Sequence, residues 1–186
     1  MAKKTLLRIF TIADYEEEEL WLREQHRNGW KLERTVTPCF YFFESCTPED
    51  VVYRLDYKNN AEDGDYMQLL RDYGWEYFNR CMGWLYFRKS ASETDAEQDQ
   101  ELFSDNASRV EMISHIVRTR MLPLLLIFFT CLLPNFFRGI EPGSVFPRGL
   151  TVLYCVLFVL YLYLFLHCGL KLRRLRQKYS DLESDL

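Results

Sequence analysis

The first ninety residues contain two similar successions of polar and apolar segments. In each one, a charged segment with a helical stripe of apolar side chains ends at a glycine that is followed by a tryptophan, at Gly29-Trp30 and at Gly74-Trp75. Apolar and polar residues then alternate, which is typical of a half-buried strand. A dense aromatic segment closes each succession, at 40–44 and at 84–89. The pattern indicates one structural unit used twice.

The two successions align from the Gly-Trp pair to the end of the last strand. A shift of 45 positions places Tyr41-Phe42 on Tyr86-Phe87 and Ser45 on Ser90 without a gap. Further strand-like segments precede both helices, so the order is β-α-β-β, given twice. Short hairpin connections favour antiparallel neighbours. We therefore predict an α+β domain with one mostly antiparallel sheet and two helices on one face, in a ferredoxin-like arrangement.

The Gly-Trp pairs have an expected structural role. Glycine suits the left-handed conformation that ends many helices, so Gly29 and Gly74 are expected to end the two helices. Trp30 and Trp75 are expected to anchor the returning strands in the core and to set their register, because burying one large aromatic side chain contributes roughly 2–3 kcal/mol.

Two long apolar segments follow the duplicated region. Residues 121–137 carry no charge over 17 positions, and residues 150–170 carry none over 21 positions. About 20 apolar residues are enough for a helix to cross a bilayer. We predict a two-helix transmembrane hairpin and regard a buried two-helix core as the weaker alternative.

Charge is distributed unevenly between the two parts. Up to residue 108 there are 13 Lys+Arg and 22 Asp+Glu, and afterwards 10 and 5. The acidic part lacks the clustered basic surface that nucleic-acid binding requires. The apolar segments are flanked by basic residues: Arg118, Arg120, Lys171, Arg173, Arg174, Arg176 and Lys178. Such flanks place both termini in the cytoplasm and attract anionic lipid of the cytoplasmic membrane, and the start of the chain lacks the apolar run of a cleavable signal peptide.

These observations together predict a domain organisation. The expected segments are a cytosolic duplicated domain at 1–90, an acidic linker at 91–101, a juxtamembrane helix at 102–120, transmembrane helices at 121–137 and 150–170, an extracytoplasmic loop at 138–149 and a basic, then acidic, cytoplasmic tail at 171–186.

No catalytic or metal-binding motif is present. The six cysteines form no CxxC pair, which favours reduced thiols. His26, His115 and His167 lie far apart and have no ligand at metal-binding spacing. Other polar groups are better explained without catalysis or modification: the run Glu16–Glu19 as a solvated helix start, Asp56 with Asp65 or Asp72 as surface and turn residues, and Cys168 as an unmodified interface cysteine. We expect no cofactor, no metal and no enzymatic activity.

The aromatic residues of the strands provide the candidate binding surface. If Trp30, Leu32, Phe40, Phe42, Leu85 and Phe87 face the helices, strand alternation directs Tyr41, Phe43, Phe78, Trp84 and Tyr86 to the other face. An exposed aromatic face of this size marks a contact surface. The alternative is that homodimerisation, the segment around Phe103 or the membrane-proximal helix covers it.

Several motifs together resemble one protein family. They are the two Gly-Trp pairs, Tyr53-Arg54-Leu55-Asp56-Tyr57, the aromatic segment 83–89, and Leu102-Phe103-Ser104-Asp105 with Ser108. The set resembles the bacterial domain-of-unknown-function family DUF2812 over roughly residues 5–110. The resemblance implies a membrane-anchored cytosolic domain of a Firmicutes-type bacterium, often encoded beside PadR-like repressors. It implies no catalytic residues.

The leading functional hypothesis is a membrane-anchored regulatory or sensor protein. It would act by binding a protein partner or a second copy of itself, and it would be linked to PadR-type regulation. Two alternatives are open: a binding module for a small amphipathic ligand such as a drug or lipid, and an accessory subunit of a membrane transporter.

Overall fold

The computed structural model describes residues 2–36, 39–57, 64–93, 102, 106–140 and 148–184. The chain divides into two compact units, Met1–Ser108 and Arg109–Leu186, and each is described by itself. The expected acidic linker lies mostly outside the described residues, as do most of the expected loop between the two apolar helices and the last residues of the tail.

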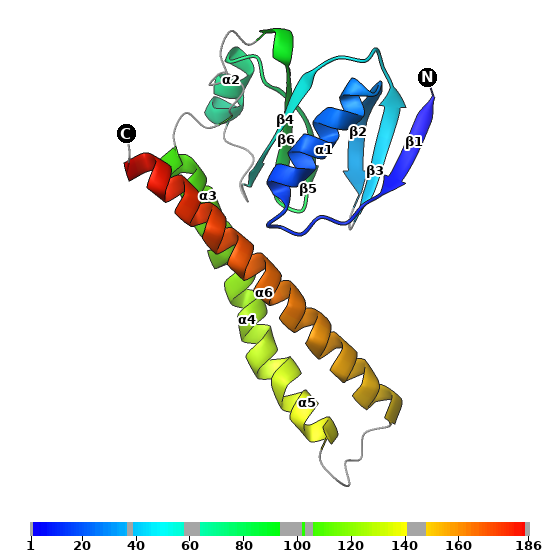
Figure 1. The fold of residues 1–186 in the computed structure, drawn as a ribbon, viewed down its shortest axis with the longest axis vertical. Helices are drawn as coiled ribbons and strands as arrows, with labels where there is room; N and C mark the ends of the chain where they lie inside the picture. The colour runs from blue at the N-terminus through cyan, green and yellow to red at the C-terminus, as the bar shows by residue number, and fades with distance from the viewer. Residues whose placement is uncertain are drawn as a thin grey trace. The chain divides into compact units, whose positions relative to one another are not determined.

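The first unit is an α+β domain with the expected order of elements (Figure 1). Its first half contains β1 (Lys3–Leu7), α1 (Tyr15–Arg27), β2 (Trp30–Val36) and β3 (Phe40–Ser45), and its second half contains β4 (Val51–Tyr57), α2 (Gly64–Asp72), β5 (Glu76–Cys81) and β6 (Trp84–Ser90). The strands form two three-stranded antiparallel sheets, ordered β1-β3-β2 and β4-β6-β5. The prediction of one continuous sheet is therefore wrong.

The two helices pack on opposite faces of the second sheet. Leu70 of α2 is buried in one cluster with Trp75, Leu85 and Phe87. Tyr86, which lies between the last two of these along β6, instead bonds to Glu18 of α1. Since neighbouring residues of a strand point to opposite faces, α1 covers the face that α2 leaves free. The expectation that both helices share one face is wrong.

Helix α1 also covers one face of the first sheet. The ring of Trp21 contacts those of Tyr41 and Phe43, with centroids 5.0 and 5.7 Å apart. The two sheets approach one another along β2 and β5, where the amide of Asn79 donates to the hydroxyl of Thr35 at 2.7 Å. Helix α1 is thus packed against both sheets, and it joins the two halves of the domain.

The two hairpins differ in length by one residue. Val36 pairs with Phe40 across the first hairpin, whereas Cys81 pairs with Trp84 across the second. The gapless alignment of the two halves is therefore offset by one residue in the last strand. A one-residue shift moves every side chain of a strand to the other face, so Tyr41 faces the helix of its own half, whereas Tyr86 faces away from α2.

Both Gly-Trp glycines end helices in the predicted way. Gly29 has a φ of +80° and Gly74 a φ of +82°, and the backbone N–H of each bonds to a carbonyl in the last turn of its helix. The tryptophans differ. Trp75 is 3 % exposed in the core, whereas Trp30 is half-buried, with the ammonium of Lys4 5.2 Å from its ring centroid. The anchoring role predicted for both therefore holds in the second half alone.

The two glycines are expected to respond unequally to substitution. Replacement by alanine introduces left-handed strain of about 1–2 kcal/mol at either position. At Gly29 the new Cβ would also lie 3.2 Å from the backbone oxygen of Cys46, whereas at Gly74 the nearest atom is the flexible Cε of Lys89 at 3.3 Å. Urea unfolding followed by tryptophan fluorescence should show the larger loss of stability for Gly29→Ala. An equal or smaller loss than for Gly74→Ala would contradict this expectation.

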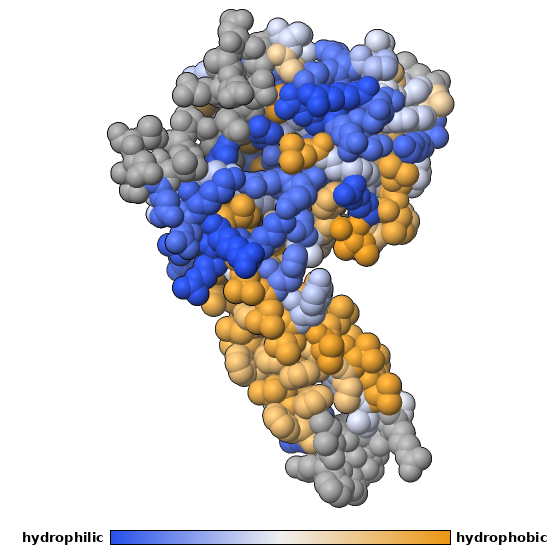
Figure 2. All heavy atoms as spheres, in the orientation of Figure 1, coloured by the Kyte–Doolittle hydropathy of each residue, from blue (hydrophilic) through white to orange (hydrophobic). Residues whose placement is uncertain are grey.

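The second unit is a pair of long helices. One runs without interruption through α3 (Asn106–Ile116), η3 (Val117–Met121), α4 (Leu122–Ile127), η4 (Phe128–Leu132) and α5 (Leu133–Ile140), and the other is α6 (Arg148–Ser184). The stretches Ser108–Arg138 and Gly149–Asp181 are long and apolar enough to cross a membrane. Figure 2 shows apolar residues gathered toward α5 and the start of α6, and hydrophilic residues toward α3 and the end of α6.

The segments η3 and η4 are π-helical, and each precedes a proline. Pro123 and Pro134 lack the N–H that would bond to the carbonyls of Thr119 and Thr130 four residues earlier. A π turn is one way in which a helix accommodates such a break. The hydroxyls of both threonines donate to the carbonyl one turn before them, at 2.7 and 2.8 Å. The first helix thus contains the same combination of π turn, threonine and proline twice, 11 residues apart.

Candidate functional site

The interior of the α+β domain contains a carboxylate shared by both sheets. Oε1 of Glu18, on α1, accepts hydrogen bonds from the hydroxyl of Tyr41 at 2.9 Å and from that of Tyr86 at 2.8 Å. Glu18 is 6 % exposed, and its burial raises the pKa of the carboxyl above its ordinary value, although both hydroxyls oppose that change. Helix α1 is therefore connected to each sheet by one buried polar contact.

Most of the aromatic surface predicted from the sequence belongs to this interior. Tyr41, Phe43, Trp84 and Tyr86 are 6, 0, 8 and 4 % exposed. Phe78 is half-buried, and the guanidinium of Arg88 lies 4.6 Å from its ring centroid. The expectation that these residues form an exposed face is wrong, because α1 packs over the four buried ones and Arg88 lies over Phe78. Trp84 and Tyr86 do point away from α2, as expected, but α1 covers that side.

A second polar contact fastens α1 to the edge of the second sheet. Glu19 accepts a hydrogen bond from the backbone N–H of Leu55 at 2.7 Å. Leu55 lies in β4, an edge strand of its sheet, so the carboxylate occupies a donor that an edge strand otherwise leaves unpaired. The predicted solvated helix start at Glu16–Glu19 therefore holds only in part, since Glu18 and Glu19 are both buried.

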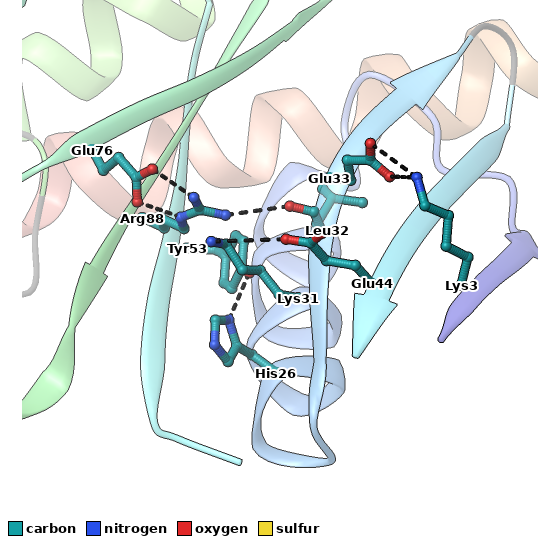
Figure 3. A network of polar contacts seen from close by, with 9 residues as sticks. All are labelled: Lys3, His26, Lys31, Leu32, Glu33, Glu44, Tyr53, Glu76 and Arg88. Atoms are coloured by element: carbon teal, nitrogen blue, oxygen red, sulfur yellow. Dashed lines mark hydrogen bonds and ion pairs between the residues drawn. The ribbon is translucent and has the colours of Figure 1, made fainter. Parts of the chain in front are cut away.

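A line of polar side chains follows the boundary between the two halves (Figure 3). Nδ1 of His26 lies 2.8 Å from the hydroxyl of Tyr53. Arg88 donates two hydrogen bonds of 2.6 Å to Glu76 and one of 3.3 Å to the backbone carbonyl of Leu32. Burial, together with the charge of Arg88, lowers the pKa of His26, which favours the neutral imidazole. Burial raises the pKa of Tyr53 to about 12.

This polar line borders an open groove of about 460 Å³. Its lining mixes cationic and anionic side chains, namely Lys31, Arg88 and Lys89 with Glu49 and Glu76. Arg88 is already neutralised by Glu76. Mixed charge with one internal ion pair gives no preference for an anion or a cation. In the described part of the chain, no cluster of three His, Cys, Asp or Glu side chains could hold a metal ion.

Asp50 joins α1 to the loop before the second half. Its carboxylate accepts two hydrogen bonds from Arg23, at 2.7 and 2.8 Å, and two from Arg27, at 2.9 and 2.6 Å. These bonds lower the pKa of Asp50 well below its ordinary value. Bidentate contacts between arginine and carboxylate fix orientation as well as contributing energy. The contact therefore sets how α1 meets the second half.

The other candidate carboxylates have structural roles. Asp56 is 1 % exposed and accepts a 2.7 Å hydrogen bond from the hydroxyl of Tyr66, so its predicted surface or turn position is wrong. Asp65 lies in the first turn of α2, and Asp72, at its end, accepts a hydrogen bond from the side-chain amide of Gln68.

One face of the first sheet has no helix of the same unit over it among the described residues. Leu7, Phe40 and Val36 form a row across β1, β3 and β2, and they are 64, 39 and 42 % exposed. Phe42 lies on the same face, with the guanidinium of Arg34 4.7 Å from its ring centroid. We call these five residues the uncovered face. The sequence pattern predicts that Phe40 and Phe42 lie on the helix-covered side, which is wrong.

The basic residues predicted to flank the membrane lie at one end of the helix pair. Arg118 and Arg120 belong to η3, and the five between Lys171 and Lys178 belong to α6. The guanidinium of Arg109 lies 4.9 Å from the ring centroid of Tyr179. A Cβ on Gly169 would lie 3.9 Å from Cε of Met121. The first helix therefore runs alongside the end of α6, and the structure brings both basic groups together.

The fold defines a class of two-part proteins, in which an α+β domain with two similar halves precedes a pair of helices long and apolar enough to cross a membrane. The chain belongs to the family described as "Protein of unknown function (DUF2812)", whose model matches residues 14–127. The match extends from the last residue before α1 to the end of α4. No curated protein and no solved structure matches the chain.

Proposed function

We propose that the chain is a membrane-anchored binding protein whose α+β domain holds a protein partner on the uncovered face. The observation that carries the proposal is the row of Leu7, Phe40 and Val36, which exposes three apolar side chains side by side on one sheet. Contiguous exposed apolar residues with a polar rim are typical of contact surfaces.

The charges around this row specify the chemistry of the partner. Lys3 pairs with Glu33 at 3.2 Å and Lys31 with Glu44 at 4.0 Å along the border of the face. Arg34 differs, since its guanidinium lies over Phe42, and in the described part of the chain no carboxylate forms an ion pair with it. We infer a partner with an apolar surface and a carboxylate opposite Arg34. Aromatic and arginine side chains dominate many interface energies.

The helix pair supplies the tether in this proposal. Both termini lie on the cytoplasmic side, because the basic residues gather at the end of the pair where α3 begins and α6 ends. The same residues attract anionic lipid head groups. The resemblance to a family often encoded beside PadR-like repressors extends the proposal to a regulatory role, in which capture of the partner at the membrane is the regulated step.

Site-specific photo-crosslinking in the native host tests the proposal. With p-benzoylphenylalanine in place of Phe40 in the tagged full-length chain, one discrete adduct is expected, and Arg34→Glu should abolish it. The matched control is the same photoprobe in place of Leu20, which lies on α1 and is 65 % exposed. Adducts that are identical from both positions would overturn the proposal. An adduct of the chain with itself would show that the partner is a second copy of this chain and not a separate protein.

A further inference from the structure

The helix pair contains a groove of about 410 Å³ within its apolar part. Ile127, Leu157 and further leucines form most of its lining, and the polar exceptions include Asn135, Tyr154 and Tyr161. Asn135 lies on α5, just after the π-helical segment η4, and π turns inside helices often occur at functional positions. Figure 2 shows apolar residues covering the pair toward α5 and the start of α6.

Asn135 and Tyr154 differ from the other polar groups of this region. The hydroxyl of Thr130 donates to the carbonyl of Leu126, and that of Tyr161 donates to the carbonyl of Leu124. Asn135 donates one N–H to the carbonyl of Cys131 at 2.7 Å. Within the described residues, the amide oxygen and the second N–H of Asn135 have no partner, and neither has the hydroxyl of Tyr154.

Unpartnered polar groups are costly in hydrocarbon and usually face another helix or a polar cavity. The carboxamide of asparagine is both a hydrogen-bond donor and an acceptor. In a symmetric dimer, the Asn135 side chains of the two copies can therefore hydrogen-bond to each other across the two-fold axis. A lipid acyl chain offers neither a hydrogen-bond donor nor an acceptor. Amide side chains hydrogen-bond across helices in membranes in this manner.

We propose that this groove is the interface of a symmetric dimer in the membrane, in which Asn135 of each copy lies against the groove of the other. The inference rests on the membrane anchoring in the proposed function, but not on the uncovered face, because it concerns the helix pair and the uncovered face belongs to the α+β domain. It accounts for the unpartnered polar groups of Asn135 and Tyr154 in a groove that is mostly apolar.

A native cysteine makes the interface testable. Cys131 lines the same groove one helical turn from Asn135, and it is exposed. In vesicles of phosphatidylcholine and phosphatidylglycerol, oxidation of the full-length chain with copper phenanthroline should give a disulfide-linked species of twice 22.4 kDa. Cys131→Ser should abolish it and Cys155→Ser should retain it. If the dimer is instead lost with Cys155→Ser and kept with Cys131→Ser, the groove is not the interface.

The contribution of Asn135 is measured without cross-linking. Resonance energy transfer between labelled chains, followed as the protein-to-lipid ratio changes, gives the dimerisation constant. Asn135→Leu should weaken dimerisation about three- to tenfold, whereas the matched control Thr130→Val, whose hydroxyl is bonded within its own helix, should not. Wild type that is monomeric at every ratio, or equal constants for the two variants, would overturn the proposal. A monomer that retains one lipid in native mass spectrometry would assign the groove to lipid instead.

Discussion

Replacing Phe43 with alanine is expected to lower the free energy of unfolding of the α+β domain by about 3–5 kcal/mol. The side chain is fully buried and packs edge-on against Trp21 of α1. Truncation removes an aromatic ring from the junction between helix and sheet and leaves a cavity there. All four tryptophans belong to this domain, so urea unfolding followed by their fluorescence reports on it in the full-length chain in detergent.

The matched control lies three residues away on the same strand. Phe40 points to the uncovered face and is 39 % exposed, so Phe40→Ala should lower stability by no more than about 1 kcal/mol. The comparison tests directly which face of β3 is buried, because the sequence pattern predicts the larger loss of stability for Phe40→Ala. Equal losses for the two variants would contradict the structure.

Replacing Glu18 with alanine is expected to lower the free energy of unfolding by about 2–4 kcal/mol, because Tyr41 and Tyr86 then lose the acceptor of their buried hydroxyls. Glu18→Gln is the matched variant, since its amide oxygen still accepts both bonds and carries no charge. It should keep most of the stability that Glu18→Ala loses. If the two variants lose the same amount, the carboxylate does not connect the sheets energetically.

The same pair of proteins has a predicted pH dependence. Burial raises the pKa of Glu18 in the folded state above the ordinary value of 4.5. The folded state therefore holds the proton more tightly, and the resulting stabilisation is complete below pH 4.5 and is lost as the pH rises through the folded-state pKa. Wild type should lose stability relative to Glu18→Gln as the pH is raised from 4.5 upward in urea unfolding. A constant difference across this range would contradict the assignment.

Local structure was largely predictable from the residues themselves. Alternation in 30–36 and 51–57 predicts strands, and both are strands. The glycines at 29 and 74 predict helix ends because a left-handed residue without a Cβ carries no strain there, and both have positive φ. The two long apolar segments in the last third of the chain predict two helices long enough to cross a membrane, and two such helices are present among the described residues.

Face assignment failed for a specific physical reason. A gapless repeat requires both hairpins to have the same length, but the second is one residue shorter. A shift of one residue exchanges the two faces of a strand. Tyr86 therefore points away from its own helix, whereas Tyr41 points toward α1. Periodicity shows that a strand has two unlike faces, but it does not show which face a distant helix covers.

The buried carboxylates could have been found in part. Tyr15, Glu18, Glu19, Leu22 and His26 recur at the spacing of one helix face, so Glu18 and Glu19 lie on the apolar stripe of α1. That position indicates burial. Their partners Tyr86 and the backbone of Leu55 come from the other half of the chain, and no local pattern connects them. The contact of Asp50 with Arg23 and Arg27 is likewise non-local.

By itself the sequence determined the helices and strands, the glycine-ended helices, the family and the apolar length of the helix pair, because each depends on neighbouring residues or on composition. The tertiary structure alone decided that the six strands form two sheets and that α1 packs against both. It also decided that Phe40 and Phe42, rather than Tyr41 and Phe43, lie on the uncovered face. These outcomes depend on contacts between segments far apart in the chain, where one residue of hairpin length decides which side chains are buried.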